Sequence, residues 1–253
     1  GTEPMGWLSG KPVLIAGKNT DLMTALANRL KEEGIDASMI AINDGPKAVS
    51  SRSLAGLILV SDSNPLSGQP EWDPDTEFLL QAFDMAHELG PKLMESGKAG
   101  GGLFACVTFM DGAFGFNGPE FSAPVMGGLA GLVKTASLEW PGVTCRAVDV
   151  SPKWKNVVSL SRALKQALLH RLDDDPVEIG LDSALPENTA YGLSLVDSPY
   201  PRGDFLLQEN DVIVVSGGAR GVTAFSAIAL ASRIRCRMIL LGRSPESFSE
   251  PQW

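Results

Sequence analysis

The sequence begins the same strand, turn and helix pattern twice, and only the second copy keeps a glycine-rich turn. The first copy starts near Pro12 and the second near Asp211, each with an apolar run that ends at a glycine. An apolar strand that turns sharply at glycine into a helix is the opening unit of a parallel α/β fold. The chain is therefore expected to start two α/β units in succession.

The second copy has the features of a nucleotide-binding turn. Gly217, Gly218 and Gly221 stand between an apolar strand and an apolar helical run, and a second strand begins at Arg237. A helix N-terminus beside a strand end presents free backbone N–H groups and the positive end of the helix dipole, which suits a pyrophosphate. The three glycines would let the backbone approach that group.

A single cation follows the second strand of this copy. Arg243 stands where dinucleotide folds sense the adenosine ribose, and a cation there fits a 2′-phosphate, which favours NADPH over NADH. Thr223 replaces the last glycine of the usual pattern. The alternative is an ordinary strand-to-helix turn with a surface arginine, because glycine motifs of this kind also occur without a nucleotide.

The first copy has lost the same features. Gly17 is present, but Asp21 and Met23 stand at the next two glycine positions. A carboxylate at a helix start repels phosphate, and a methionine side chain fills the space that phosphate needs. We expect this half to keep the nucleotide-binding fold without the nucleotide.

Apolar strand-like runs alternate with helical periods along the chain, which predicts a Rossmann-like, doubly wound parallel sheet. The predicted strands are 13–16, 37–42, 55–60, 103–109 and 144–150, and the predicted helices are 21–33, 75–95, 122–139 and 157–171. Short alternating runs at 177–180 and 189–196 predict a β-hairpin and not another strand-helix unit. We expect one domain over 1–208 and the start of a second over 209–253.

Charge and cysteine content limit the binding partners and the cellular compartment that we expect for this chain. The net charge of −9 makes nucleic acid an unlikely partner, although the last 43 residues carry five arginines against three acids. Cys106, Cys145 and Cys236 are far apart in apolar runs, which indicates reduced core residues of a cytoplasmic protein. No apolar run is long enough to span a membrane. The first residues lack an initiator methionine, so we expect the chain to be cut from a longer polypeptide.

The residues 127–141, 215–224 and 241–244 resemble the ketoreductase domain of polyketide synthases and polyunsaturated fatty acid synthases, within the short-chain dehydrogenase/reductase superfamily. The order of residues 217–223 is most similar to the polyunsaturated fatty acid synthase type. The resemblance implies a cofactorless structural subdomain followed by the first part of an NADPH-binding catalytic subdomain. It extends the cofactor role from the glycines and Arg243 to backbone contacts of Ser216, Ala219, Arg220 and Val222.

The resemblance also indicates which positions would hold the catalytic residues, and the superfamily's catalytic side chains are absent from them. A superfamily serine orients the carbonyl, a tyrosine donates a proton and a lysine lowers the pKa of that tyrosine. Ser122 and Met126 stand at the tyrosine and lysine positions, and Phe109 and Met110 lie near the serine position. We therefore expect no catalytic residue. His87, His170, Asp111, Asp149 and the acidic run 173–175 are expected to be structural or solvated.

The implied parent reaction is reduction of a β-ketoacyl thioester on acyl carrier protein by NADPH, and this chain alone is expected to be inactive. Its partners would be the rest of the catalytic subdomain and the neighbouring synthase domains. A noncatalytic scaffold or docking module of the synthase is the alternative, and a standalone nucleotide-binding regulator is a weaker one. Because the tail 211–253 exposes strand edges, self-association is also expected.

Overall fold

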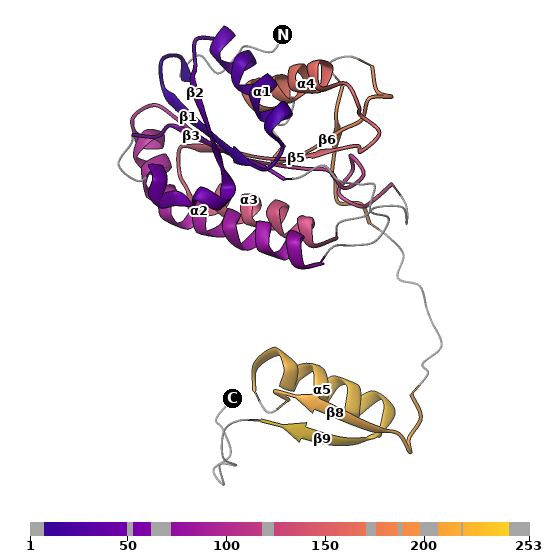
Figure 1. The fold of residues 1–253 in the computed structure, drawn as a ribbon. Helices are drawn as coiled ribbons and strands as arrows, with labels where there is room; N and C mark the ends of the chain where they lie inside the picture. Colours follow the sequence, from indigo (N-terminus) through magenta and orange to yellow (C-terminus); the bar gives the residue numbers. More distant parts are fainter. Residues whose placement is uncertain are drawn as a thin grey trace. The chain divides into compact units, whose positions relative to one another are not determined.

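The computed structural model describes residues 8–49, 53–61, 72–117, 124–170, 176–186, 189–197, 207–218 and 220–242. The chain divides into two compact units, Gly1–Leu195 and Val196–Trp253, which are drawn in Figure 1. The assignment of the two parts as a structural and a catalytic subdomain stays a prediction.

The first unit is built on a seven-stranded sheet in the order β2-β1-β3-β4-β5-β6-β7. All neighbouring strands are parallel except β6 and β7. The strands are β1 (Pro12–Gly17), β2 (Asp36–Ala41), β3 (Gly56–Val60), β4 (Gly102–Thr108), β5 (Val143–Val150), β6 (Glu178–Leu181) and β7 (Tyr191–Gly192). Every residue of β3 and β4 is buried, which explains why these strands are continuous apolar runs.

Helices cover both faces of this sheet (Figure 1). The helices α1 (Thr20–Glu32) and α4 (Val157–Leu169) pack on one face, and α2 (Trp72–Lys98) and α3 (Gly127–Glu139) pack on the other. Short 3₁₀ helices lie at Ile42–Asp44, Pro46–Val49 and Pro124–Met126. Leu26 and Leu164 belong to one apolar core, and Leu89 and Val133 to the other. The predicted doubly wound sheet is confirmed.

The end of this sheet differs from the prediction. The expected hairpin is present, because β6 and β7 are antiparallel with Ile179 opposite Gly192. However, β6 also pairs in parallel with β5, where Val148 lies opposite Ile179. The hairpin prediction is therefore confirmed, but the sequence did not reveal that β6 also extends the parallel sheet. A buried parallel strand of four residues is too short for its apolar run to be distinguished from a hairpin arm.

The second unit contains β8 (Val212–Ser216), α5 (Gly221–Ile234) and β9 (Arg237–Leu241). The two strands are parallel and pair Val214 with Ile239, and α5 buries Ala224 and Ala227. The helix ends at Arg235, which adopts a left-handed conformation with φ of 55°. The strand-helix-strand prediction for this segment is confirmed.

The prediction of three core cysteines agrees only in part with the structure. Cys106 and Cys145 are buried free thiols, whereas Cys236 is half-buried. Burial raises the pKa of the Cys145 thiol to about 12.

Among the described residues, no helix is long and apolar enough to cross a membrane, and no group of histidine, cysteine and acidic residues could hold a metal ion.

Candidate functional site

The turn between β8 and α5 is open at two of its glycines. Gly217 has φ of 74° and Gly221 has φ of 59°, which are values that only glycine adopts without strain. A Cβ atom placed on either residue would meet no described atom within 4 Å. The backbone of this turn is therefore accessible to an approaching group.

Gly218, the middle glycine of the turn, is needed for a different reason. A Cβ atom on Gly218 would lie 2.7 Å from Leu240 Cδ2 and 2.8 Å from Val215 Cγ1. The turn is also tied to β9, because the Gly217 N–H donates to the carbonyl of Leu241 at 2.7 Å. Gly218 thus allows the turn to pack closely on the strands, and the open glycines lie on either side of it.

The N-terminus of α5 has no competing group among the described residues. Its N-cap residue, Arg220, is extended and its side chain makes no capping hydrogen bond. No acidic residue lies in the first turn of the helix. The first backbone N–H groups of a helix have no partner within it and carry its positive dipole end. This terminus can therefore hold an anion.

The structure brings most of the predicted cofactor residues to this turn. Ser216 ends β8, and Arg220 and Val222 are exposed at the start of α5. Ala219 and Arg243 lie outside the described residues. The cofactor role of the whole set, including the preference for NADPH that rests on Arg243, stays a prediction.

The equivalent turn of the first unit is filled. A Cβ atom on Gly17 would lie 2.3 Å from the carbonyl oxygen of Val60 and 3.1 Å from the sulfur of Met23, which is buried. The Asn19 side chain accepts the Leu22 N–H at 3.2 Å and so caps α1. Asp21 adds a carboxylate to the first turn. The positions of Met23 and Asp21 agree with the sequence prediction, whereas the Asn19 cap was not predicted.

A buried carboxylate organises the loop that follows β4. Asp149, at the end of β5, is 0% exposed. One of its oxygens accepts hydrogen bonds from Thr108 Oγ1 and Met110 N, both at 2.8 Å. The other accepts from Gly112 N at 2.8 Å, Phe114 N at 2.9 Å and Asp111 N at 3.2 Å. Both carboxylate oxygens accept hydrogen bonds from the protein, so the role of Asp149 is structural, as expected.

A second carboxylate continues this arrangement. Asp111 accepts hydrogen bonds from the backbone N–H groups of Ala113, Gly115 and Asn117 at 2.8 to 2.9 Å. Burial raises the pKa of Asp111, but the N–H donors of Gly115, Asn117 and Ala113 together lower it below its usual value. The sequence placed both acids at strand ends but did not reveal that they are joined in one loop.

The positions aligned with the superfamily's catalytic residues are apolar. Phe109, Met110 and Met126 are 6%, 4% and 3% exposed and belong to the two cores. Ser122 lies outside the described residues. Lys134, two turns further along α3, pairs with Glu178 at 3.0 Å. At these described positions the first unit offers no group that could transfer a proton to a substrate.

Comparison with known proteins supports the resemblance seen in the sequence. The chain is 32% identical over 171 residues to one subunit of a polyunsaturated fatty acid synthase from Thraustochytrium sp.. The match covers 64% of this chain and 6% of that much longer protein. The resemblance to a polyunsaturated fatty acid synthase is therefore confirmed. No protein-family profile matches the chain.

Two solved structures show the extent of structural similarity. A gluconate 5-dehydrogenase of Burkholderia cenocepacia, in complex with NADP and tartrate, has a TM-score of 0.44 and 15% identity and covers 66% of this chain and 91% of its own. An alcohol dehydrogenase of Thermococcus sibiricus, complexed with 5-hydroxy-NADP, has a TM-score of 0.40 and 13% identity. The match covers 79% of this chain and 91% of the dehydrogenase.

Proposed function

We propose that this chain is part of the ketoreductase of a polyunsaturated fatty acid synthase. In the complete domain, the turn between β8 and α5 would bind NADPH, and a β-ketoacyl thioester on acyl carrier protein would be reduced. The observation that carries the proposal is the open glycine turn with its uncapped helix, in a chain similar to such a synthase. Isolated from the rest of its domain, the chain would not turn over substrate.

Each part of the turn would have its own role in binding this cofactor. The backbone at Gly217 and Gly221 would admit the pyrophosphate, and the first N–H groups of α5 would donate to it. The guanidinium of Arg243 would pair with the 2′-phosphate. When bound, NADPH supplies the hydride for reduction of the β-keto group.

The exposed faces of the second unit support the need for a larger domain. In the first unit, β1 pairs with β2 on one edge and with β3 on the other, and helices cover both faces. In the described part of the second unit, β8 and β9 pair only with each other. Val212, Val214, Ile239 and Leu241 are 48% to 59% exposed there. Parallel sheets are normally covered on both faces, so further strands and helices of the catalytic subdomain would complete the unit.

The first unit would have a structural role in this ketoreductase. Its nucleotide turn is filled by Met23, and the aligned catalytic positions are occupied by buried apolar side chains such as Met126. The same observation favours the second candidate function, a noncatalytic scaffold or docking module of the synthase. The two candidates differ in whether the second unit binds NADPH once the domain is complete.

The test is NADPH titration of the polypeptide extended through the complete second unit, followed by cofactor fluorescence. A Gly221→Val variant would strain the backbone at positive φ and place a side chain in the open space, so we expect at least about 10-fold weaker binding. Gly131→Ala is the matched control, because Gly131 lies in α3 with open space around it and without positive φ. Absence of NADPH binding by the folded, extended wild type would favour the scaffold.

A further inference from the structure

One stretch of this acidic chain carries only positive charge. Residues 151–170 contain three lysines and one arginine and no acidic residue, although the whole chain has a net charge of −9. Lys165 pairs with Glu33. Lys153, Lys155 and Arg162 are exposed and make no hydrogen bond or ion pair with any other described residue. Their charges are therefore available at the surface.

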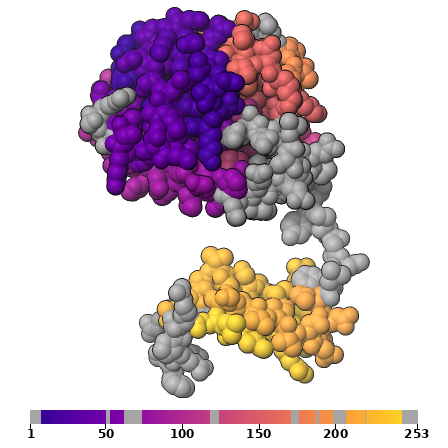
Figure 2. Space-filling view, in the orientation of Figure 1, coloured from indigo at the N-terminus to yellow at the C-terminus, as the bar shows by residue number. Residues whose placement is uncertain are grey.

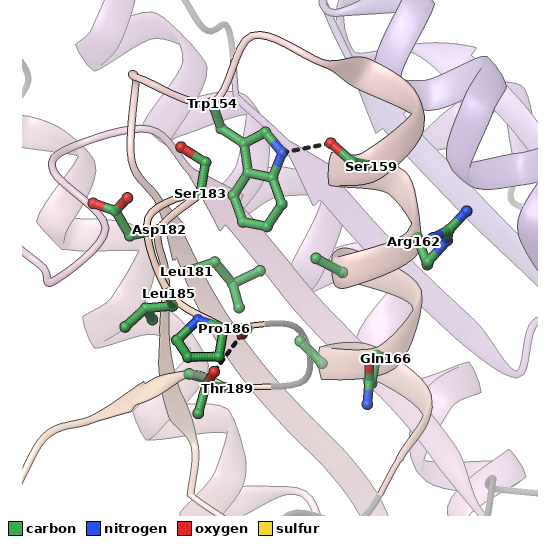
Figure 3. A pocket seen from close by; sticks show the side chains of 13 residues that line it. Trp154, Ser159, Arg162, Gln166, Leu181, Asp182, Ser183, Leu185, Pro186 and Thr189 are labelled. Carbon is green, nitrogen blue, oxygen red and sulfur yellow. Dashed lines mark hydrogen bonds between the residues drawn. The ribbon is translucent and has the colours of Figure 1, made fainter.

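Arg162 lines a pocket of about 240 Å³ between α4 and the turn that follows β6 (Figure 3), and Lys153 and Lys155 are the chain neighbours of another lining residue, Trp154. In Figure 3 the indole of Trp154 and the side chains of Leu181 and Pro186 border the hollow opposite the helix. Ala163 and Ala167 are the small residues that leave space on the helix side. The surface of α4 is visible beside α1 in Figure 2. Seven of the thirteen described lining residues are apolar, and the polar ones include Arg162, Gln166 and Asp182.

Hydrogen bonds hold both walls of the pocket in place. Trp154 Nε1 donates to Ser159 Oγ at 2.8 Å, and that hydroxyl donates to the carbonyl of Asn156 at 3.0 Å. On the other side, the Ala184 N–H donates to Asp182 Oδ1 at 2.8 Å and closes a tight turn. Asp182 is the sole acidic residue among those described as lining the pocket. These hydrogen bonds fix the Trp154 indole against the start of α4 and close the turn after β6.

We propose that this pocket, together with Lys153, Lys155 and Arg162, binds an acidic peptide segment through one large apolar side chain. The pocket is smaller than the roughly 300 to 1,000 Å³ of sites for drug-sized molecules, and its size suits a single side chain such as phenylalanine. Lys153 and Lys155 are exposed and precede and follow Trp154 in the chain, so we expect carboxylates that flank the anchor to reach a cation. Apolar anchors that fill pockets supply much of the binding energy of protein interfaces, and complementary charges around them favour the correct partner.

The probe is the synthetic peptide acetyl-Glu-Asp-Phe-Asp-Glu-amide, titrated calorimetrically into the full chain at low salt. We expect saturable binding with a dissociation constant on the order of 100 μM that weakens as salt is added. Replacing the phenylalanine with alanine, or all four acids with their amides, should weaken binding about 10-fold. These peptide changes leave the protein intact. Lack of saturable binding, or equal binding of the amide peptide, would overturn the proposal.

Protein variants locate the site. Lys153→Gln with Lys155→Gln should weaken binding about fivefold, whereas Lys31→Gln with Lys98→Gln removes the same charge elsewhere and should change it less than about twofold. Ala163→Leu would fill the pocket and abolish binding, and Val158→Leu, at an exposed position of α4, is its control. Equal losses in the two lysine pairs would refute a specific site. Phenylacetate binding as tightly as the peptide would refute a peptide ligand.

Discussion

The Asp149 carboxylate offers the sharpest test of how the first unit is held together. In an Asp149→Asn variant, the size of the side chain is kept but one acceptor oxygen becomes an NH₂ group. If the NH₂ replaces the oxygen that accepts from Asp111, Gly112 and Phe114, three backbone N–H groups lose their acceptor. A hydrogen bond to a charged group contributes about 1.5 kcal/mol or more, so we expect a loss of about 3 to 5 kcal/mol of unfolding free energy.

Urea unfolding followed by circular dichroism measures this loss. For an m-value of about 2 kcal/mol per molar, the midpoint should fall by roughly 2 M. Asp182→Asn is the matched control, because that carboxylate is half-buried and accepts one described N–H, from Ala184. It should shift the midpoint by less than about 0.5 M. Equal midpoints for Asp149→Asn and the wild type would refute the view that this carboxylate organises the loop.

Three further outcomes are expected. Because the pKa of Asp111 is lowered in the folded state, its contribution is present above the unfolded-state value near 4 and is lost as pH falls through the folded value; Asp111→Asn should reduce the loss of stability below about pH 4 in acid titrations. Gly218→Ala should destabilise the second unit by about 1 to 3 kcal/mol, measured by hydrogen exchange in β8 and β9, and unchanged protection would contradict the close packing. Burial raises the pKa of Cys106 and Cys145, so a thiol reagent should label Cys236 first in the native chain, and faster labelling of either buried thiol would contradict the structure.

Local sequence signals predicted much of this fold. The apolar runs of β1 to β5 and the glycine turn before α5 are each visible within about ten residues, because strand burial and sharp turns impose local residue choices. The parallel pairing of β6 with β5 was missed because it depends on neighbours that are distant in the chain. The bonds of Asp149 span 35 to 41 residues, and the pocket beside Trp154 joins α4 to a turn after β6. Such features follow from strand order, which no short pattern encodes.

NADPH oxidation with a β-ketoacyl thioester should be measured for this chain and for the polypeptide extended through the complete second unit. We expect turnover by the extended form and none by the chain alone. No turnover by a folded, extended form would contradict the ketoreductase and favour the scaffold, and turnover by the chain alone would contradict its lack of catalytic residues.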